Sequence, residues 1–248
     1  MCGIGGEARF DGSRPDDAAV TRMTEAMRSR GPDGEGLWSD GWVTLGHRRL
    51  TIIDLSDAGA QPMVREDLGL GLVFNGCIYN YPELREELRN AGYDFRSTSD
   101  TEVILVAYAH WGERFVDHLV GMFAFGLVDQ VRRRLVLARD RLGVKPLYLA
   151  ETPDRLRFAS SLPALLRAGD VDTGIDPVAL HHYLSWHSIV PAPRTILRGV
   201  RKLPPATLRI VEADGRSREE RYWQPDYIRE PAEAAMGARD WQAAVGEA

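Results

Sequence analysis

The stretch MCGIGGEARF at residues 1–10 predicts that the fold begins with a strand at the very start of the chain. Cys2, Ile4, Ala8 and Phe10 fall on one parity, and the residues between them at odd positions are glycines or charged, an alternation typical of a β-strand. One of the chain's two cysteines therefore follows the initiator methionine directly, with three glycines close behind it. These residues alone leave two interpretations of Cys2 open, a small apolar residue of a strand or a nucleophile.

The composition is that of a globular protein. The chain has 248 residues, 44% of them hydrophobic, and a formal net charge of -5 with both signs well mixed, so no basic stripe indicates a nucleic-acid partner. Two cysteines in a chain of this size suit a reducing compartment rather than a disulfide framework. The sequence shows no signal peptide and no apolar stretch of membrane-spanning length, so we expect a cytoplasmic protein without a membrane partner.

The remaining pattern predicts an antiparallel α+β domain. Short β-rich runs follow one another at hairpin spacing with few helices between them, which excludes a βαβ repetition. Helices are predicted over residues 15–29, 82–91, 162–167 and 177–186, and at the Ala-rich end from about residue 231.

Three local signals add detail to this pattern. The run Trp42–Asp54 predicts a strand, a loop and a second strand. Asn75-Gly76 lies between two β-rich runs and is typical of a hairpin turn. Ser99 with Glu102 is typical of a capping box at the start of a further helix.

A cysteine in the second position can act without a histidine partner. Removal of Met1, which a small second residue permits, leaves Cys2 with a free α-amine and a thiol on one residue. The ordinary pKa of an α-amine is about 7.7–8.0, so the amine is partly neutral at physiological pH and can accept a proton, directly or through water. Such a site still needs donors for an oxyanion and a charged clamp for the substrate.

Blocks along the chain resemble the class II glutamine amidotransferases, the N-terminal nucleophile (Ntn) glutaminase domains, and in particular the asparagine synthetase group. The blocks stand in the order and spacing of that family and cover nearly the whole chain. They are MCGIGG, RGPDGEG, GHRRLTIIDLS with AGAQPM, VFNGCIYN, STSDTEVIL, LVGMFAFGLVD, LARDRLGVKPLYLA, VPAPRTILRGVRKLPP and RYW. The resemblance implies the Ntn four-layer αββα sandwich, in which two antiparallel sheets pack between helical layers.

The resemblance also implies catalytic roles for three residues. Cys2 would attack the side-chain amide of L-glutamine, with its α-amine as proton shuttle. The Asn75 side chain and the Gly76 backbone N–H would form the oxyanion hole, which needs donors placed in advance. A plain hairpin turn explains the Asn-Gly pair equally well without any chemistry, and the two interpretations are compatible.

Substrate binding is implied for four more residues. Arg49 would pair with the α-carboxylate of glutamine and Asp100 with its α-ammonium, because a zwitterion needs one charge of each sign. Backbone groups of Leu50 and Ile52 would line the pocket. Alternatives exist here too, since an aspartate suits the first turn of a helix and an arginine the surface. His47 is interpreted as structural, and no histidine pattern indicates a metal site.

Cys77 departs from the family pattern, which usually has a glutamate in its Asn-Gly-Glu-Ile-Tyr-Asn hairpin. With the stretch LHHYLSWHSIVPAPRTI, this variant most resembles the subgroup that amidates N-acetylglutaminylglutamine. Cys2 and Cys77 are expected to line one pocket, but a disulfide between them is not expected in a reducing cytoplasm.

The resemblance divides the chain into three parts. We expect a glutaminase domain at residues 1–172, a proline-rich connecting segment at 173–226 and the start of a truncated synthetase domain at 227–248. The sequence has no Ser-Gly-Gly-x-Asp-Ser loop, so ATP and Mg²⁺ are expected only in the missing synthetase domain, and no cofactor in this chain. L-Glutamine and that synthetase domain are the expected partners, with a second copy of the chain as a further candidate.

The predicted function is release of ammonia from L-glutamine through a Cys2 thioester, within an enzyme that makes asparagine or amidates N-acetylglutaminylglutamine. Two alternatives are a non-catalytic interaction module of the same fold and an Ntn hydrolase of another amide. The joint presence of Cys2, Arg49, Asn75 and Asp100 favours the glutaminase.

Overall fold

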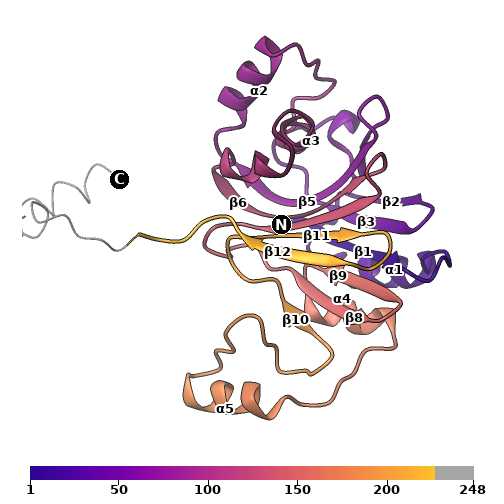
Figure 1. Cartoon of the computed structure of the whole chain (residues 1–248), viewed down its shortest axis with the longest axis vertical. Helices are drawn as coiled ribbons and strands as arrows, with labels where there is room; N and C mark the ends of the chain where they lie inside the picture. Colours follow the sequence, from indigo (N-terminus) through magenta and orange to yellow (C-terminus); the bar gives the residue numbers. More distant parts are fainter. Residues whose placement is uncertain (227–248) are drawn as a thin grey trace, which may run out of the picture.

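The computed structural model describes residues 1–226, and Figure 1 shows two antiparallel sheets lying face to face. The first sheet contains β1 (Gly3–Arg9), β2 (Gly34–Asp40), β3 (Val43–Arg49), β8 (Tyr148–Thr152), β9 (Arg155–Ala159) and β10 (Arg201–Lys202). Its order is β10-β8-β9-β1-β3-β2, so the strand predicted at the start of the chain lies inside the sheet between β9 and β3.

The second sheet has the order β12-β11-β7-β6-β5-β4. Its strands are β4 (Met63–Arg65), β5 (Leu70–Ile78), β6 (Gly121–Asp129), β7 (Arg134–Arg139), β11 (Thr207–Glu212) and β12 (Ser217–Arg221). The helices are α1 (Asp17–Glu25), α2 (Tyr81–Asn90), α3 (Asp100–Trp111), α4 (Leu162–Ala168) and α5 (Pro177–Ser185), with short 3₁₀ turns at Asp57–Gly59 and Gly112–Asp117.

Three apolar clusters hold the layers together. One fills the space between the sheets and includes Ile4, Val73 and Phe158. A second packs α2 and α3 on the outer face of the second sheet, and a third packs α1 and α4 on the outer face of the first. This arrangement confirms the four-layer αββα sandwich, and Figure 1 shows α5 lying apart from it.

Two glycines allow the sheets to approach around one phenylalanine. A Cβ on Gly6 would lie 2.6 Å from the Phe158 ring, and a Cβ on Gly126 would lie 2.7 Å from the same ring. Phe158 is fully buried between the sheets, so a side chain at either glycine would displace it. The glycines behind Cys2 therefore serve packing as well as the strand.

The predicted hairpin turn at Asn75-Gly76 is wrong. Both residues lie inside β5, where Asn75 pairs with Ala124 and Gly76 with Phe123 of β6. The long-range pairing with β6 overrides the local turn preference of Asn-Gly. The second strand predicted before Asp54 is also not formed, because the chain leaves the sheet after β3 ends at Arg49.

The helix predicted after Ser99 is confirmed, but its capping differs from the prediction. The Ser99 hydroxyl accepts a hydrogen bond from Thr101 N, at 3.1 Å. Glu102 does not close a capping box; its carboxylate is buried and binds Arg65 Nη1 at 2.8 Å and the backbone N–H of Arg96 and Ser97. The Glu102 carboxylate therefore forms a tertiary ion pair with Arg65 instead of the cap that the local pattern predicted.

The later part of the described chain contributes to both sheets. β11 pairs with β7 along its whole length, and β10 pairs with β8. Strands from the predicted connecting segment therefore complete the sandwich. The helix predicted from about residue 231 lies outside the described residues. No helix within residues 1–226 is long and apolar enough to cross a membrane.

A buried ion pair fastens β1 to β9. Arg157 Nε donates to Glu7 Oε2 at 2.6 Å, and both side chains are almost fully buried. Arg157 also donates to the Gly169 carbonyl at 2.8 Å, and Glu7 Oε1 accepts from Asp16 N at 3.1 Å. The pair therefore connects the first sheet to the ends of α1 and α4.

Replacing Arg157 with leucine should lower the free energy of unfolding by about 3–5 kcal/mol, because Glu7 would stay buried without its partner. Urea unfolding at pH 7 measures this change. The matched control is Arg216→Ala, which breaks the exposed Arg216–Asp214 pair and should cost less than about 1 kcal/mol. Equal effects of the two substitutions would contradict a structural role for the buried pair.

Candidate active site

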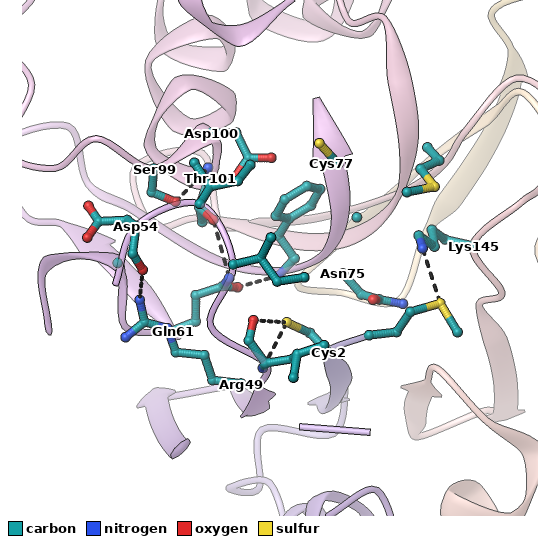
Figure 2. A pocket seen from close by; sticks show the side chains of 18 residues that line it. Cys2, Arg49, Asp54, Gln61, Asn75, Cys77, Ser99, Asp100, Thr101 and Lys145 are labelled. Carbon is teal, nitrogen blue, oxygen red and sulfur yellow. Dashed lines mark hydrogen bonds between the residues drawn. The ribbon is translucent and has the colours of Figure 1, made fainter. Parts of the chain in front are cut away.

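A cavity of about 270 Å³ lies at one end of the sandwich, where the two sheets meet. The period-two alternation aims two residues at it, because Cys2 shares its parity with Ile4 and Asn75 shares its parity with Val73, both of which point between the sheets. Figure 2 shows these side chains together with residues that loops bring to the cavity. The sequence-predicted residues Cys2, Arg49, Leu50, Ile52, Asn75, Gly76 and Asp100 all line it.

Cys2 is held by the backbone of Leu50, the residue after β3 ends. The thiol Sγ lies 3.4 Å from Leu50 N and 3.6 Å from Leu50 O. Burial raises the pKa of Cys2, while the Leu50 hydrogen bond and the positive charge of Arg49 act in the opposite direction. Burial therefore favours the thiol over the thiolate.

One edge of β5 is unpaired beside the cavity. β4 pairs with β5 only from Leu70 to Leu72, and the backbone N–H groups of Phe74, Gly76 and Ile78 then point away from β6. Buried backbone donors without partners are costly, so this edge needs other acceptors. The acceptors that it finds determine the shape of the site.

Side chains cap the two outer N–H groups of this edge. Gln61 Oε1 accepts from Phe74 N at 2.6 Å, and Asp100 Oδ2 accepts from Ile78 N at 3.0 Å. Within residues 1–226 no side chain caps the Gly76 N–H between them, and Gly76 lines the cavity. The edge thus presents a single backbone donor to whatever occupies the cavity.

Asn75 supplies a second donor. Its side chain is 1% exposed, and its Nδ2 is buried without a hydrogen-bond partner in the described part of the chain. Gly76 must be glycine for close packing, since a Cβ there would lie 2.2 Å from the Met122 carbonyl oxygen. Two unpaired donors beside a thiol are the arrangement that an oxyanion requires.

Arg49 brings an uncompensated positive charge to the cavity. Its Nη2 donates to the carbonyls of Asp54 at 2.5 Å and Ser56 at 2.9 Å, and no carboxylate of the described residues forms an ion pair with it. The Asp54 carboxylate instead binds Ser56 and Thr98, which fixes the loop that carries these carbonyls. The guanidinium is therefore positioned by backbone oxygens and keeps its charge for a ligand.

Asp100 brings the negative charge. It is the first residue of α3, is 4% exposed and lies on the cavity wall. Burial raises the pKa of Asp100, while the Ile78 N–H acts in the opposite direction. One residue thus begins the helix, caps the strand edge and brings a carboxylate to the cavity wall, so the helix-dipole alternative and the predicted binding role are compatible.

Sequence reasoning missed several residues of this site. Gln61 lines the cavity and positions the β5 edge, although its block AGAQPM was part of the resemblance. Met122 of β6 and Lys145 of the loop after β7 also line it. Cys77 lines it as expected, and both cysteines are free thiols. No periodic signal marks these residues, because each reaches the cavity through tertiary contacts.

A family profile described as a glutamine amidotransferase domain matches residues 1–223. The chain belongs to this family. The amidotransferase domain is 42% identical over 196 residues to the glutamine-hydrolyzing asparagine synthetase 1 of Bacillus subtilis (strain 168), covering 79% of this chain and 30% of that protein. It is 36% identical over 226 residues to asparagine synthetase 3 of the same organism, covering 90% and 36%. The chain thus spans about a third of the length of these relatives.

Among solved structures, the domain resembles the glutamine phosphoribosylpyrophosphate amidotransferase of B. subtilis, with a TM-score of 0.68 at 20% sequence identity. The match covers 90% of this chain and 50% of that one. At this identity the likeness concerns the fold alone, and it agrees with the Ntn sandwich described above.

His47 of the amidotransferase domain is a structural histidine beside the site. It is fully buried on β3, its Nε2 lies 3.3 Å from the Phe74 carbonyl, and burial lowers its pKa to about 3. The unfolded chain binds a proton near pH 6.5, whereas the folded chain does so only near pH 3. His47 therefore favours the folded state above pH 6.5, and this contribution is lost as the pH falls toward 3.

Replacing His47 with glutamine should make the free energy of unfolding less sensitive to acid. Between pH 6 and pH 5 the difference between the two proteins should change by about 1.2 kcal/mol, in favour of the variant at the lower pH. Urea unfolding at both pH values measures it. The exposed His110→Gln should show no such change, and a variant as acid-sensitive as the parent would show that His47 is not buried in its neutral form.

Proposed function

We propose that this domain hydrolyses L-glutamine to glutamate and ammonia, with Cys2 as the nucleophile. The observation that carries the proposal is the pair of unpaired donors, Gly76 N–H and Asn75 Nδ2, in the same cavity as the Cys2 thiol. Arg49 and Asp100 line the same cavity and match the two charges of an amino-acid zwitterion.

The first step needs the α-amine that removal of Met1 exposes. The amine accepts the proton of the Cys2 thiol, and the thiolate forms a bond to the carbonyl carbon Cδ of the substrate's side-chain amide. The carbonyl oxygen becomes negative in the tetrahedral intermediate and accepts hydrogen bonds from Gly76 N–H and Asn75 Nδ2. Because both donors are unpaired before the substrate binds, they need no rearrangement when the oxyanion forms.

The second step releases ammonia. The protonated amine gives its proton to the amide nitrogen, the C–N bond breaks, and a γ-glutamyl thioester remains on Cys2. A water molecule that gives its proton to the neutral amine then attacks the thioester. The C–S bond breaks, glutamate leaves, and the thiol is restored.

Arg49 and Asp100 hold glutamine during both steps. The guanidinium pairs with the α-carboxylate and the Asp100 carboxylate with the α-ammonium, while Leu50 and Ile52 complete the wall. The clamp places the γ-amide at Cys2 only for a side chain of glutamine length, which distinguishes this proposal from a hydrolase of another amide. Asparagine, one methylene shorter, should react far more slowly.

The ammonia would serve an ATP- and Mg²⁺-dependent synthetase domain outside this chain, as the names of the relatives suggest. We propose residues 1–172 as the glutaminase, with 173–226 leading to that domain and 227–248 at its start. Exposed apolar side chains gather on and after α5 and support a covering partner; they are Val178, Leu180, Tyr183, Leu184, Trp186 and Ile189. Either asparagine synthesis or amidation of N-acetylglutaminylglutamine in the cytoplasm fits this scheme, and the family variant Cys77 favours the latter.

The test of the glutaminase is the intact mass of the purified chain before and after exposure to a diazoketone analogue of glutamine. The expected result is loss of the Met1 mass and one adduct, absent from Cys2→Ala, together with glutamate release from glutamine but not from asparagine. A processed chain that forms no adduct and releases no glutamate would show that the module is non-catalytic.

Replacing Asn75 with alanine should reduce kcat for glutamine hydrolysis about 10²–10³-fold with little change in KM, because the lost donor acts on the transition state. Steady-state glutamate release measures both constants. Asn90→Ala at the exposed end of α2 is the matched control and should leave them unchanged. A rise in KM alone would assign Asn75 to ground-state binding instead.

A further inference from the structure

Lys145 is a buried cation at the edge of the cavity with no role in the steps above. The residue is 4% exposed, and its Nζ lies 3.1 Å from the Met1 sulfur. Figure 2 shows Lys145 at the cavity, with a dashed line from its nitrogen to a sulfur atom. Within residues 1–226 it forms no ion pair with a carboxylate. A buried ammonium with only a thioether as partner costs stability, so a fold that keeps one requires a functional reason.

The loop that carries Lys145 is fixed from both sides. The Asp140 carboxylate is fully occupied by backbone N–H donors rather than by the lysine ammonium; they belong to Phe123, Leu142, Val144 and Lys145. Arg139 donates to the carbonyls of Lys145 at 2.9 Å and Gly143 at 2.7 Å. The direction of the Lys145 side chain is therefore built into the fold.

Removal of Met1 also removes the hydrogen-bond partner of Lys145. The Met1 sulfur leaves with its residue, and a new α-amine appears on the Cys2 nitrogen to which Met1 was joined. The ammonium of Lys145 then points into the space that the Met1 side chain had filled, in the cavity that Cys2 also lines. A like charge in the same cavity disfavours protonation of the weaker base, which is the α-amine.

We propose that Lys145 is a positioning residue of the glutaminase site, whose ammonium keeps the α-amine of processed Cys2 neutral and able to accept the thiol proton. The inference rests on the proposed function, because the amine acts as a base only in that reaction. Without such a cation an α-amine is mostly protonated at pH 7 and is a poor base there.

Other charges face the same corner. Arg30 Nε donates to the Cys2 carbonyl at 3.2 Å, and the charge of Arg49 lowers the pKa of the Cys2 thiol, so both bring positive charge to the same corner as Lys145. Asp100 opposes them. The Cys77 thiol lies within reach of both Lys145 and Asp100, and its burial raises its pKa, so it adds no charge at neutral pH. Among residues 1–226, no backbone carbonyl accepts a hydrogen bond from the Lys145 ammonium, unlike the guanidinium groups of Arg30 and Arg49.

The test is the pH dependence of kcat/KM for glutamine hydrolysis in processed wild type, Lys145→Met and Lys145→Arg. Methionine keeps the length of the side chain and removes its charge, and arginine keeps the charge. Lys202→Met is the matched control, because Lys202 donates to the Val190 carbonyl and does not line the cavity. The acidic limb of Lys145→Met should move up by about one pH unit, a roughly tenfold loss at pH 6.5 that shrinks as the pH rises.

Lys145→Arg and Lys202→Met should keep the wild-type limb. An unchanged limb in Lys145→Met would overturn the proposal. So would a thermal midpoint several degrees below wild type in both Lys145→Met and Lys145→Gln, because removing an unpaired buried charge should maintain or raise it.

A second measurement separates this proposal from the glutaminase itself. The rate at which acetic anhydride acetylates the Cys2 α-amine, followed by mass of the N-terminal peptide, reports the protonation of that amine without turnover. If wild type forms no glutamate, the proposed function fails, yet the acetylation midpoint still shows whether Lys145 lowers the amine pKa. Equal midpoints in wild type and Lys145→Met would reject the role of Lys145 even in an active enzyme.

Discussion

The unpaired edge of β5 is the constraint on which the site depends. β4 ends its pairing at Leu72, and from there β5 must find acceptors other than a strand. Gln61 and Asp100 satisfy the outer N–H groups and leave the Gly76 N–H for a ligand. The unpaired part of β5 thus leaves one backbone donor at the cavity. Gln61 and Asp100, which cap the neighbouring N–H groups, also connect β5 to the loop before β4 and to α3.

Two groups of charged side chains contrast in this domain, those that form buried ion pairs and those that line the cavity without a carboxylate partner. Glu7 with Arg157 and Arg65 with Glu102 are buried as ion pairs, and their geometry joins strands to helices and loops. Arg49 and Lys145 line the cavity without a carboxylate partner among the described residues.

Burial also bears on the base that the proposed function requires. Burial raises the pKa of Cys2, and His47 beside the site is held neutral on the Phe74 carbonyl. The proposed function therefore assigns the base to the α-amine of Cys2 itself, which requires no further side chain. In that proposal the cations around the amine favour its neutral form.

The sequence by itself determined the strand at residues 3–9, most of the helices and the antiparallel class, because alternation and caps are local properties. The sequence also identified Cys2, Arg49 and Asp100 as candidate site residues, because the motifs around them indicate their chemistry. Only the tertiary structure decided that Asn75-Gly76 lies within a strand, because pairing with β6 outweighs the local turn preference. It likewise decided that Glu102 binds Arg65, and that Gln61 and Lys145 reach the cavity, because these contacts join residues far apart in the chain. Local patterns carry no information on such pairings, whose free energy comes from burial that exists only in the folded chain.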